Sequence, residues 1–187
     1  MKKIILFAAI LFAGVSVVKA DGIVIGEGDV KVTLTLQPFQ SIVIGGTGDD
    51  GSSTGNNVNL VYKDATDYSE GVTTTMKEHL SVVAAGRYAV KVKAKTGVFN
   101  QSSGGATYDV SNITLTAKAN TEGAKAGSSI DLSTTEATLI ASDTGTGTGV
   151  TYDVAYKGAG DNQYVEMLKD NAETIYTTEI TYTIVAE

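Results

Sequence analysis

Residues 176–184, Tyr-Thr-Thr-Glu-Ile-Thr-Tyr-Thr-Ile, alternate between two kinds of side chain over their whole length. In an extended chain, one face of this segment would carry Tyr176, Thr178, Ile180, Tyr182 and Ile184, and the other Thr177, Glu179, Thr181 and Thr183. Successive side chains of a β-strand point to opposite faces of the sheet, so a period of two predicts a half-buried strand. The end of the chain therefore favours a β-sheet protein.

The same alternation recurs along the chain, in residues 30–36, 42–44, 58–62, 88–92, 113–117 and 150–156, with a shorter apolar segment at 137–141. Turn-rich segments separate them, at 45–57, 100–105, 120–129 and 143–149. Short alternating strands separated by such turns predict an all-β fold, an immunoglobulin-like or Greek-key β-sandwich. Residues 71–84 and 163–171 break the pattern, and each has room for one helical turn.

The first twenty residues have the pattern of a secretory signal peptide. Met1-Lys2-Lys3 is a short cationic start, residues 4–18 carry no charge, and Val18-Lys19-Ala20 places compact residues at a cleavage site. The uncharged run is shorter than the roughly 20 apolar residues of a membrane span. We therefore expect residues 1–20 to be a signal peptide, 21–37 an N-terminal extension or first strand, and 38–187 one β-sandwich domain. The alternative is an uncleaved anchor; with cleavage, no membrane span remains.

The processed chain would be strongly acidic. The full chain has 14 Lys and Arg against 21 Asp and Glu, a net charge of −7. Lys2, Lys3 and Lys19 would leave with the signal peptide, which makes the net charge −10. Such a surface repels nucleic acid and anionic lipid headgroups. We expect no nucleic-acid partner.

Composition excludes several kinds of chemistry. The chain has no cysteine, so it forms no disulfide, thiolate nucleophile or Cys-ligated metal site. His79 is the only histidine, whereas hydrolytic zinc sites need three convergent protein ligands, and no Gly-x-Ser-x-Gly turn is present. We expect a protein that is not an enzyme, with no cofactor or metal, and His79 at the surface or packed at an edge.

Two further patterns suggest ligands. Residues 49–53, Asp-Asp-Gly-Ser-Ser, resemble a calcium loop but lack its alternating ligands and terminal Glu; we expect a solvated turn, with a looser calcium site between loops as the alternative. Nine tyrosines raise carbohydrate binding, because aromatic faces stack on sugars. We expect five of them in the core with hydroxyl groups at its rim: Tyr88, Tyr152, Tyr156, Tyr176 and Tyr182. Four near segment ends are freer to contact a ligand: Tyr62, Tyr68, Tyr108 and Tyr164.

The start of the processed chain carries a resemblance to a known family. Residues 21–29 are polar and broken by glycine, residues 30–36 (Val-Lys-Val-Thr-Leu-Thr-Leu) alternate, and Gln37-Pro38 precedes a short apolar strand at 39–44. In this order, and in its size and lack of cysteine, the chain resembles the major subunits of alpha-type (archaic) chaperone–usher fimbriae. The resemblance covers most of the chain and is one of pattern.

The resemblance implies an incomplete immunoglobulin-like sandwich, completed when the N-terminal strand of one subunit inserts into its neighbour. Val30, Val32, Leu34 and Leu36 would then fill the neighbour's groove. It further implies a periplasmic chaperone, and a fimbrium on the surface of a Gram-negative bacterium. Pairing of the strand within its own chain stays open.

We expect an exported structural or adhesive surface protein, a fimbria-like subunit that associates with itself or with other surface subunits. The alternative is a secreted carbohydrate-binding β-sandwich with a glycan ligand.

Overall fold

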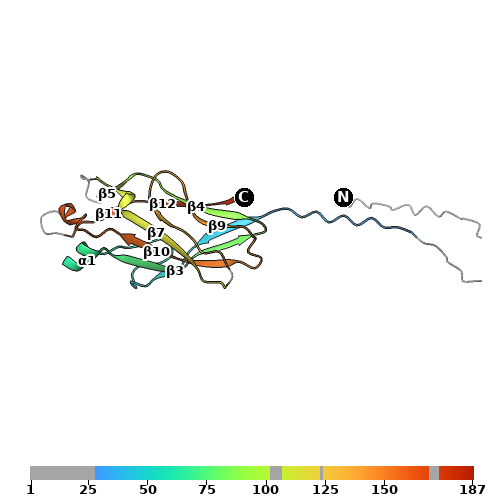
Figure 1. Ribbon diagram of the computed structural model, residues 1–187, viewed down its shortest axis with the longest axis horizontal. Helices are drawn as coiled ribbons and strands as arrows, with labels where there is room; N and C mark the ends of the chain where they lie inside the picture. The colour runs from blue at the N-terminus through green and yellow to red at the C-terminus, as the bar shows by residue number, and fades with distance from the viewer. Residues whose placement is uncertain (1–27, 102–106, 123, 169–172) are drawn as a thin grey trace, which may run out of the picture. The chain divides into compact units, whose positions relative to one another are not determined.

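The structure, a computed structural model, describes residues 28–101, 107–122, 124–168 and 173–187. The expected signal peptide and residues 21–27 lie outside the described residues. The chain divides into two compact units, Met1–Leu36 and Gln37–Glu187, and each is described by itself. The described part of the first unit, residues 28–36, is an extended segment without secondary structure (Figure 1).

The second unit is mostly β, as the alternating pattern predicts. Its strands within the described residues are β1 Gln40–Ile44, β2 Thr47–Gly48, β3 Thr73–Ala84, β4 Tyr88–Ala94, β5 Val98–Gln101, β6 Thr107–Asp109, β7 Ile113–Ala119, β8 Ser129–Asp131, β9 Ala137–Ser142, β10 Val150–Gly158, β11 Tyr176–Thr177 and β12 Ile180–Ala186. The helix α1 spans Ala65–Glu70, and the 3₁₀ turns η1 and η2 span Val110–Asn112 and Val165–Met167. No helix in the described ranges is long and apolar enough to span a membrane.

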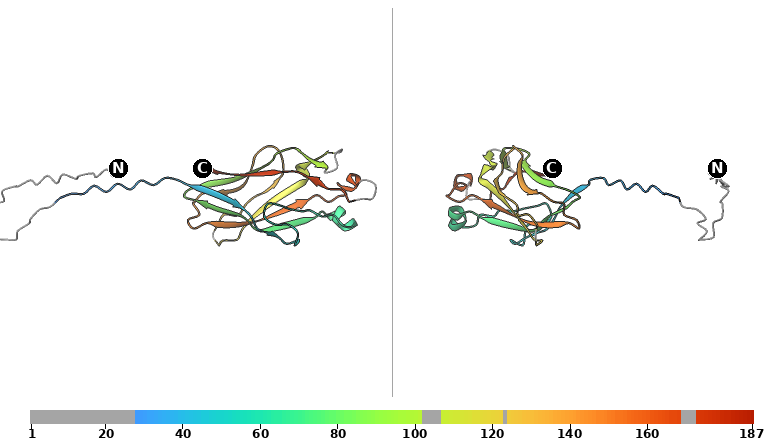
Figure 2. Two further views of the ribbon diagram at one scale, coloured as in Figure 1. Left: turned by 180° about the vertical axis from the view of Figure 1, so that it is seen from behind. Right: turned by 45° about the vertical axis from the view of Figure 1, so that its right-hand side comes forward.

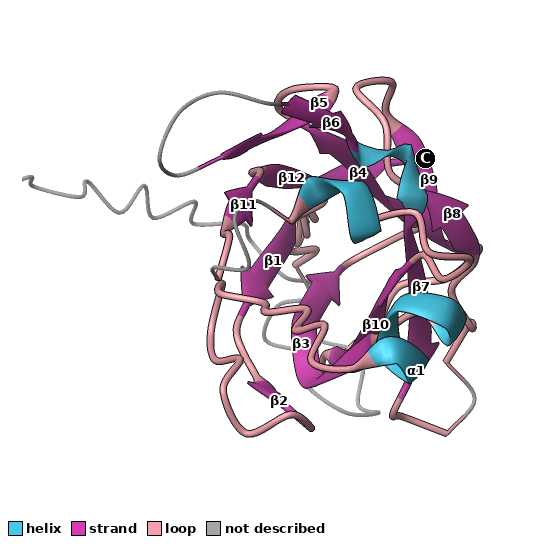
Figure 3. Cartoon of the chain, turned by 90° about the vertical axis from the view of Figure 1, so that its left-hand side faces the viewer, coloured by secondary structure: helices cyan, strands magenta, loops and turns pink. Residues whose placement is uncertain are grey.

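The strands form antiparallel sheets around one core. The largest sheet has the order β1-β3-β10-β7-β8, with β2 also paired to β3. A three-stranded sheet has the order β12-β4-β9, and a smaller one β11-β5-β6. Figure 3 shows β12, β4 and β9 on one side and β1, β3, β10 and β7 on the other. The core between them consists of Met76, Leu80, Val82, Ala84, Tyr88, Val90, Val92, Ala94, Val110, Ile113, Leu115, Ala117, Leu132, Leu139, Ile140, Val150, Tyr152, Val154 and Tyr156.

The two ends of the second unit differ in their elements. Helix α1, η2 and the β11-β5-β6 sheet lie at one end, and the C-terminus lies at the other (Figures 1 and 2). The last residue is tied there by the Glu187 N–H, which donates to the Arg87 carbonyl at 3.2 Å. Strand β12 therefore runs toward the C-terminal end of the unit.

The predicted helical turn in residues 71–84 is wrong. Those residues form the long strand β3, and the helix lies upstream at α1. Asp64 caps α1, because its carboxylate accepts hydrogen bonds from the backbone N–H groups of Thr66 and Asp67. The turn predicted in residues 163–171 is present as η2, and residues 169–171 lie outside the described residues.

Two predicted strands also need correction. Residues 58–62 pair with no strand, although Val58 and Leu60 pack against the core. The continuous strand predicted at 176–184 is interrupted at Thr178 and Glu179, where the chain passes from the small sheet to β12. Lys95 holds this crossing, since its N–H donates to the Glu179 carbonyl and its ammonium group pairs with the Glu179 carboxylate. Strand β2 lies within a segment predicted as a turn, and β5 and β8 lie partly in such segments.

Candidate functional site

Segment 28–36 exposes an apolar row. Its four large apolar side chains are 79–86% exposed: Val30, Val32, Leu34 and Leu36. A single exposed apolar residue is ordinary, whereas a row along one face of one segment marks an interaction surface. Burying each side chain is worth about 1.5–3 kcal/mol. This segment therefore gains free energy from any sheet that covers its apolar face.

Strands β1 and β12 of the second unit each have an unpaired edge. Strand β1 pairs only with β3, and β12 pairs only with β4, among the residues that the structure describes. The two strands nevertheless approach each other, and Figure 3 shows β1 below β12 on the same side of the unit. We call this pair of unpaired edges the seam. Because β4 reverses direction after β3, β1 and β12 run in roughly opposite directions.

Side chains at the seam are incompletely covered. In β12, the residues that pack against the core are only half-buried: Ile180, Tyr182 and Ile184. Their neighbours in β4, Val90 and Val92, are at most 1% exposed. Across the seam in β1, Ile42 is half-buried and Ile44 is 40% exposed. The core is therefore covered at β4 and partly open at the seam.

The opposite side of the unit is closed by backbone hydrogen bonds. The Ser128 N–H, just before β8, donates to the Leu139 carbonyl of β9 at 2.7 Å. The Leu132 N–H, just after β8, donates to the Ile113 carbonyl of β7 at 2.8 Å. The first bond connects the largest sheet to the β12-β4-β9 sheet beside β8, and the second holds the end of β8 on β7. The seam lacks such a connection within the described ranges, so it is the side on which the two sheets could accept another strand.

His79 lies in the interior, whereas the sequence predicts it at the surface or packed at an edge. It is 1% exposed and follows a bulge in β3, where the register with β10 shifts between Tyr152 and Val154. Glu78 adopts a left-handed φ of 52° at this bulge, and the irregularity turns His79 inward beside Leu80. The sequence predicts a helical turn here instead of a strand, so it gives no sign of the bulge that turns His79 inward.

Asp153 of β10 stabilises the bulge from the outer face of the sheet. Its carboxylate accepts from the Glu78 N–H at 2.8 Å and from the Asn120 amide at 2.6 Å, and pairs with Lys77 at 3.2 Å. Partial burial raises the pKa of Asp153, but these hydrogen bonds and the Lys77 charge outweigh it and hold the pKa below its usual value. The charged carboxylate therefore fixes the strained Glu78 backbone.

The core tyrosines bond to each other instead of presenting their hydroxyl groups at the rim. The hydroxyl groups of Tyr88 and Tyr152 lie 2.8 Å apart within the core, and those of Tyr156 and Tyr182 lie 2.5 Å apart. Burial raises the pKa of Tyr152, Tyr156 and Tyr182 above the ordinary value. Tyr176 differs: it lies in the small sheet, half-buried, and donates to the Met167 carbonyl.

The tyrosines expected to be freer for a ligand pack on one another near α1 and the small sheet. Tyr62 contacts Tyr68 and Tyr164 with ring centroids 5.3 and 5.1 Å apart, and Tyr108 contacts Tyr176 at 5.2 Å. The Tyr62 hydroxyl donates to the Ala159 carbonyl at 2.8 Å. These rings serve the packing at this end of the unit.

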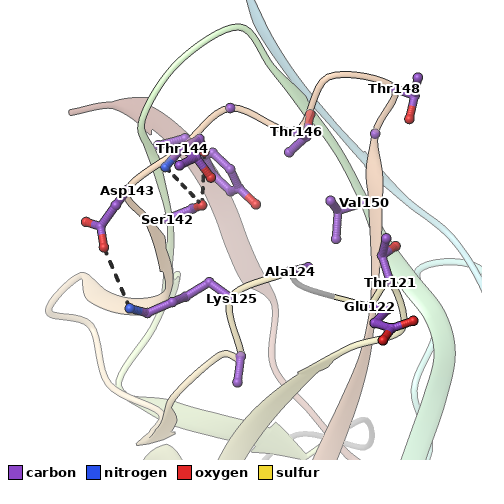
Figure 4. A pocket seen from close by; sticks show the side chains of 14 residues that line it. Thr121, Glu122, Ala124, Lys125, Ser142, Asp143, Thr144, Thr146, Thr148 and Val150 are labelled. Atoms are coloured by element: carbon purple, nitrogen blue, oxygen red, sulfur yellow. Dashed lines mark hydrogen bonds and ion pairs between the residues drawn. The ribbon is translucent and has the colours of Figure 1, made fainter.

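A pocket of about 540 Å³ lies at the other end, between the loops after β7 and β9 (Figure 4). Its lining is rich in hydroxyl groups and includes Thr121, Thr144, Thr146 and Thr148. Figure 4 shows the Lys125–Asp143 ion pair at its margin, 3.7 Å long. No aromatic face opens into it from the described lining residues, because Tyr88 is 1% exposed.

The aspartate turn at residues 49–53 closes on itself. The Asp50 carboxylate accepts from the backbone and hydroxyl groups of Ser52 and Ser53, and these bonds, the Ser52 hydroxyl first, lower the pKa of Asp50 to about 2. Among the described residues, no three His, Cys, Asp or Glu side chains gather where they could hold a metal ion. The Asp50 oxygens are thus occupied by donors of the turn, and the Asp49 carboxylate accepts from the Thr75 N–H of β3 at 2.8 Å.

No family model matches this chain, and no curated protein matches it in sequence. The sequence pointed to segment 30–36 as one half of the candidate site. It did not indicate the other half, β1 and β12, because an unpaired edge depends on which strands become neighbours.

Proposed function

We propose that this protein is an exported, non-enzymatic subunit of a bacterial surface structure, fimbria-like, that assembles by strand donation. Residues 29–36 of one copy would enter the seam of the next copy and pair with β1 and β12. The second unit would then be an incomplete immunoglobulin-like sandwich that the donated strand completes. A periplasmic chaperone would cover the seam before assembly.

The observation that carries this proposal is that one chain has two incomplete surfaces of complementary kind. Segment 28–36 has an apolar row that belongs to no sheet among the described residues. The seam has half-covered apolar side chains, and no described strand pairs with its two free edges. Alternate residues on one face of a strand are about 6.6–6.8 Å apart, and this distance is the same in any two adjacent strands. A row of Val30, Val32, Leu34 and Leu36 can therefore lie alongside Ile180, Tyr182 and Ile184.

The polar face of the segment fits the same arrangement. With the apolar row turned inward, Lys31, Thr33 and Thr35 would point outward, on the same side as Thr181 and Thr183 of β12. The apolar contribution would be on the order of 6–12 kcal/mol for four side chains. Ordering the segment costs roughly 1–2 kcal/mol per residue of backbone, so the hydrogen bonds to both edges are needed as well.

Deletion of residues 21–36 tests the donation directly. Because the described core residues all belong to the second unit and the deleted residues belong to the first, we expect the truncated protein to fold and to melt like the full-length monomer. It should no longer self-associate in size-exclusion chromatography. A synthetic peptide of residues 29–36 should bind it and raise its melting temperature, since a ligand of the native state stabilises it.

A peptide with Leu34 replaced by Asp is the matched control and should not bind. The proposal fails if the truncated protein is unfolded or aggregated and the wild-type peptide does not rescue it. That result would mean that the segment belongs to the core of its own chain.

A secreted glycan-binding module is the second candidate, and the pocket in Figure 4 favours it. Threonine hydroxyl groups and the Asp143 carboxylate are groups that hydrogen-bond sugar hydroxyls. If this pocket binds glycans, the purified monomer should bind on a glycan array and Asp143→Asn should reduce that binding at least several-fold. Asp131→Asn, on β8 away from the pocket, should bind normally. No glycan binding by the wild type would leave the assembly role as the proposed function.

A further inference from the structure

A partly buried chain of hydrogen bonds joins both strands of the seam. His79 Nδ1 lies 2.6 Å from the carbonyl oxygen of Gly45, the residue after β1. His79 Nε2 lies 2.7 Å from the Tyr156 hydroxyl of β10, which lies 2.5 Å from the Tyr182 hydroxyl of β12. The chain thus runs from the end of β1, through β3 and β10, to β12 in the facing sheet.

The partners determine which atom carries each hydrogen. A carbonyl oxygen only accepts, so Nδ1 of His79 donates to Gly45. In a neutral imidazole Nε2 then accepts, and the Tyr156 hydroxyl donates to it. Tyr182 in turn donates to the oxygen of Tyr156. Every link is satisfied only while His79 is neutral.

Among the described residues, no charged group beside the ring favours a cation. Tyr156 and Tyr182 face it edge-on, with centroids 5.6 and 6.0 Å away, and the end of β1 presents the Gly45 carbonyl. The charged residues of the bulge, Lys77 and Glu78, are exposed. Asp153 of β10 lies on the outer face and is held by its own donors.

We propose that His79 is a positioning residue for the seam: its neutral imidazole fixes β1 and β12 relative to each other, and acid loosens this arrangement. Strand acceptance rests on the proposed function, whereas the anchoring of the two strands does not. Protonation would reverse the chain, so that Nε2 donates to Tyr156 and Tyr156 to Tyr182. The Tyr182 hydrogen would lose its acceptor within the chain, and a cation would be buried among neutral groups.

The pH range follows from the burial of His79. Desolvation lowers the pKa of His79 below the ordinary value of 6.5, against a smaller opposing effect of the Gly45 hydrogen bond. The anchored state is therefore fully stable above pH 6.5 and loses stability as pH falls toward the pKa of the folded state. With one proton involved, the opening constant rises by at most tenfold per pH unit. No second histidine titrates in this range.

Hydrogen exchange of the β1 and β12 amides tests the anchor in the full-length monomer. In wild type, after correction for the intrinsic rate, we expect opening to increase several-fold between pH 7.5 and pH 5.5. His79→Gln should remove this dependence, since its amide can donate to Gly45 and accept from Tyr156 but does not titrate. The β7 amides, remote from the seam, serve as the internal reference.

Dissociation of a labelled peptide of residues 29–36 from the seam measures the same effect of His79. Its dissociation from wild type should accelerate several-fold between pH 7.5 and pH 5.5, and its dissociation from His79→Gln should not. Equal amide exchange at both pH values in wild type would overturn the inference, as would a His79→Gln variant that keeps the wild-type pH dependence. If His79→Gln does not fold, Tyr182→Phe, which breaks the chain at the seam, should give fast exchange of β12 already at pH 7.5. Failure of the peptide to bind at pH 7.5, with the exchange result intact, would refute strand donation alone.

Discussion

Leu34→Asp is expected to abolish self-association of the full-length protein, with the fold of the second unit unchanged. In the free chain Leu34 is 79% exposed, so a carboxylate there disturbs no core. In the assembled state it would face the apolar side chains of the seam without a partner. Burying a polar group unsatisfied costs at least about 3 kcal/mol, which corresponds to about 100-fold weaker association. Sedimentation velocity over a concentration series measures the association, and thermal melting measures the fold.

Thr33→Asp is the matched control, one residue away on the opposite face. It adds the same charge and the same side chain, but the carboxylate would stay in solvent beside Thr181 and Thr183, so association should weaken by less than about threefold. Equal losses for Thr33→Asp and Leu34→Asp would point to a general effect of charge on association. A lowered melting temperature of the Leu34→Asp monomer would show that the segment packs within its own chain.

The period of two was a reliable guide where a strand has neighbours on both sides. Strand β10 lies between β3 and β7, and its alternate residues from Val150 to Tyr156 are buried as the sequence predicts. The pattern is equally clear in residues 58–62, which form no strand, and in segment 30–36, which pairs with nothing described. Alternation reports that a segment can lie on a core, whereas pairing depends on which edges are free nearby.

The candidate site was predictable only in part for the same reason. The alternation of residues 30–36 predicts the apolar row directly, because each of its side chains can be assigned to a face from the sequence. The seam depends on which strands become neighbours in the folded chain, since β12 pairs with β4 and with no second strand among the described residues. His79 was misplaced because the bulge in β3 depends on Asp153, 75 residues beyond Glu78. A single histidine between a charged and an apolar residue gives no local sign of this.

Gly46→Ala is expected to destabilise the second unit strongly, whereas Gly45→Ala should be tolerated. Gly46 has φ of +89°, a conformation that side chains rarely adopt, and a Cβ there would lie 2.1 Å from the Lys77 carbonyl oxygen and 3.1 Å from the His79 Cα. These are backbone atoms of the bulge, which cannot turn away as a side chain can. The strained φ alone costs about 1–3 kcal/mol, and relieving the contact would move the bulge that holds His79.

For a unit of this size, about 2–4 kcal/mol lowers the melting temperature by roughly 5–15 °C. At Gly45 an added Cβ meets no atom within 4 Å, and the carbonyl that accepts from His79 is retained, so the change should be within about 0.5 kcal/mol. Thermal melting of the two variants beside wild type decides the matter. Because Gly46 fits against the bulge, Gly46→Ala should also increase exchange of the β1 amides more than that of the β7 amides. Similar melting of Gly45→Ala and Gly46→Ala would mean that the loop after β1 does not depend on the bulge, and that His79 is positioned by the core alone.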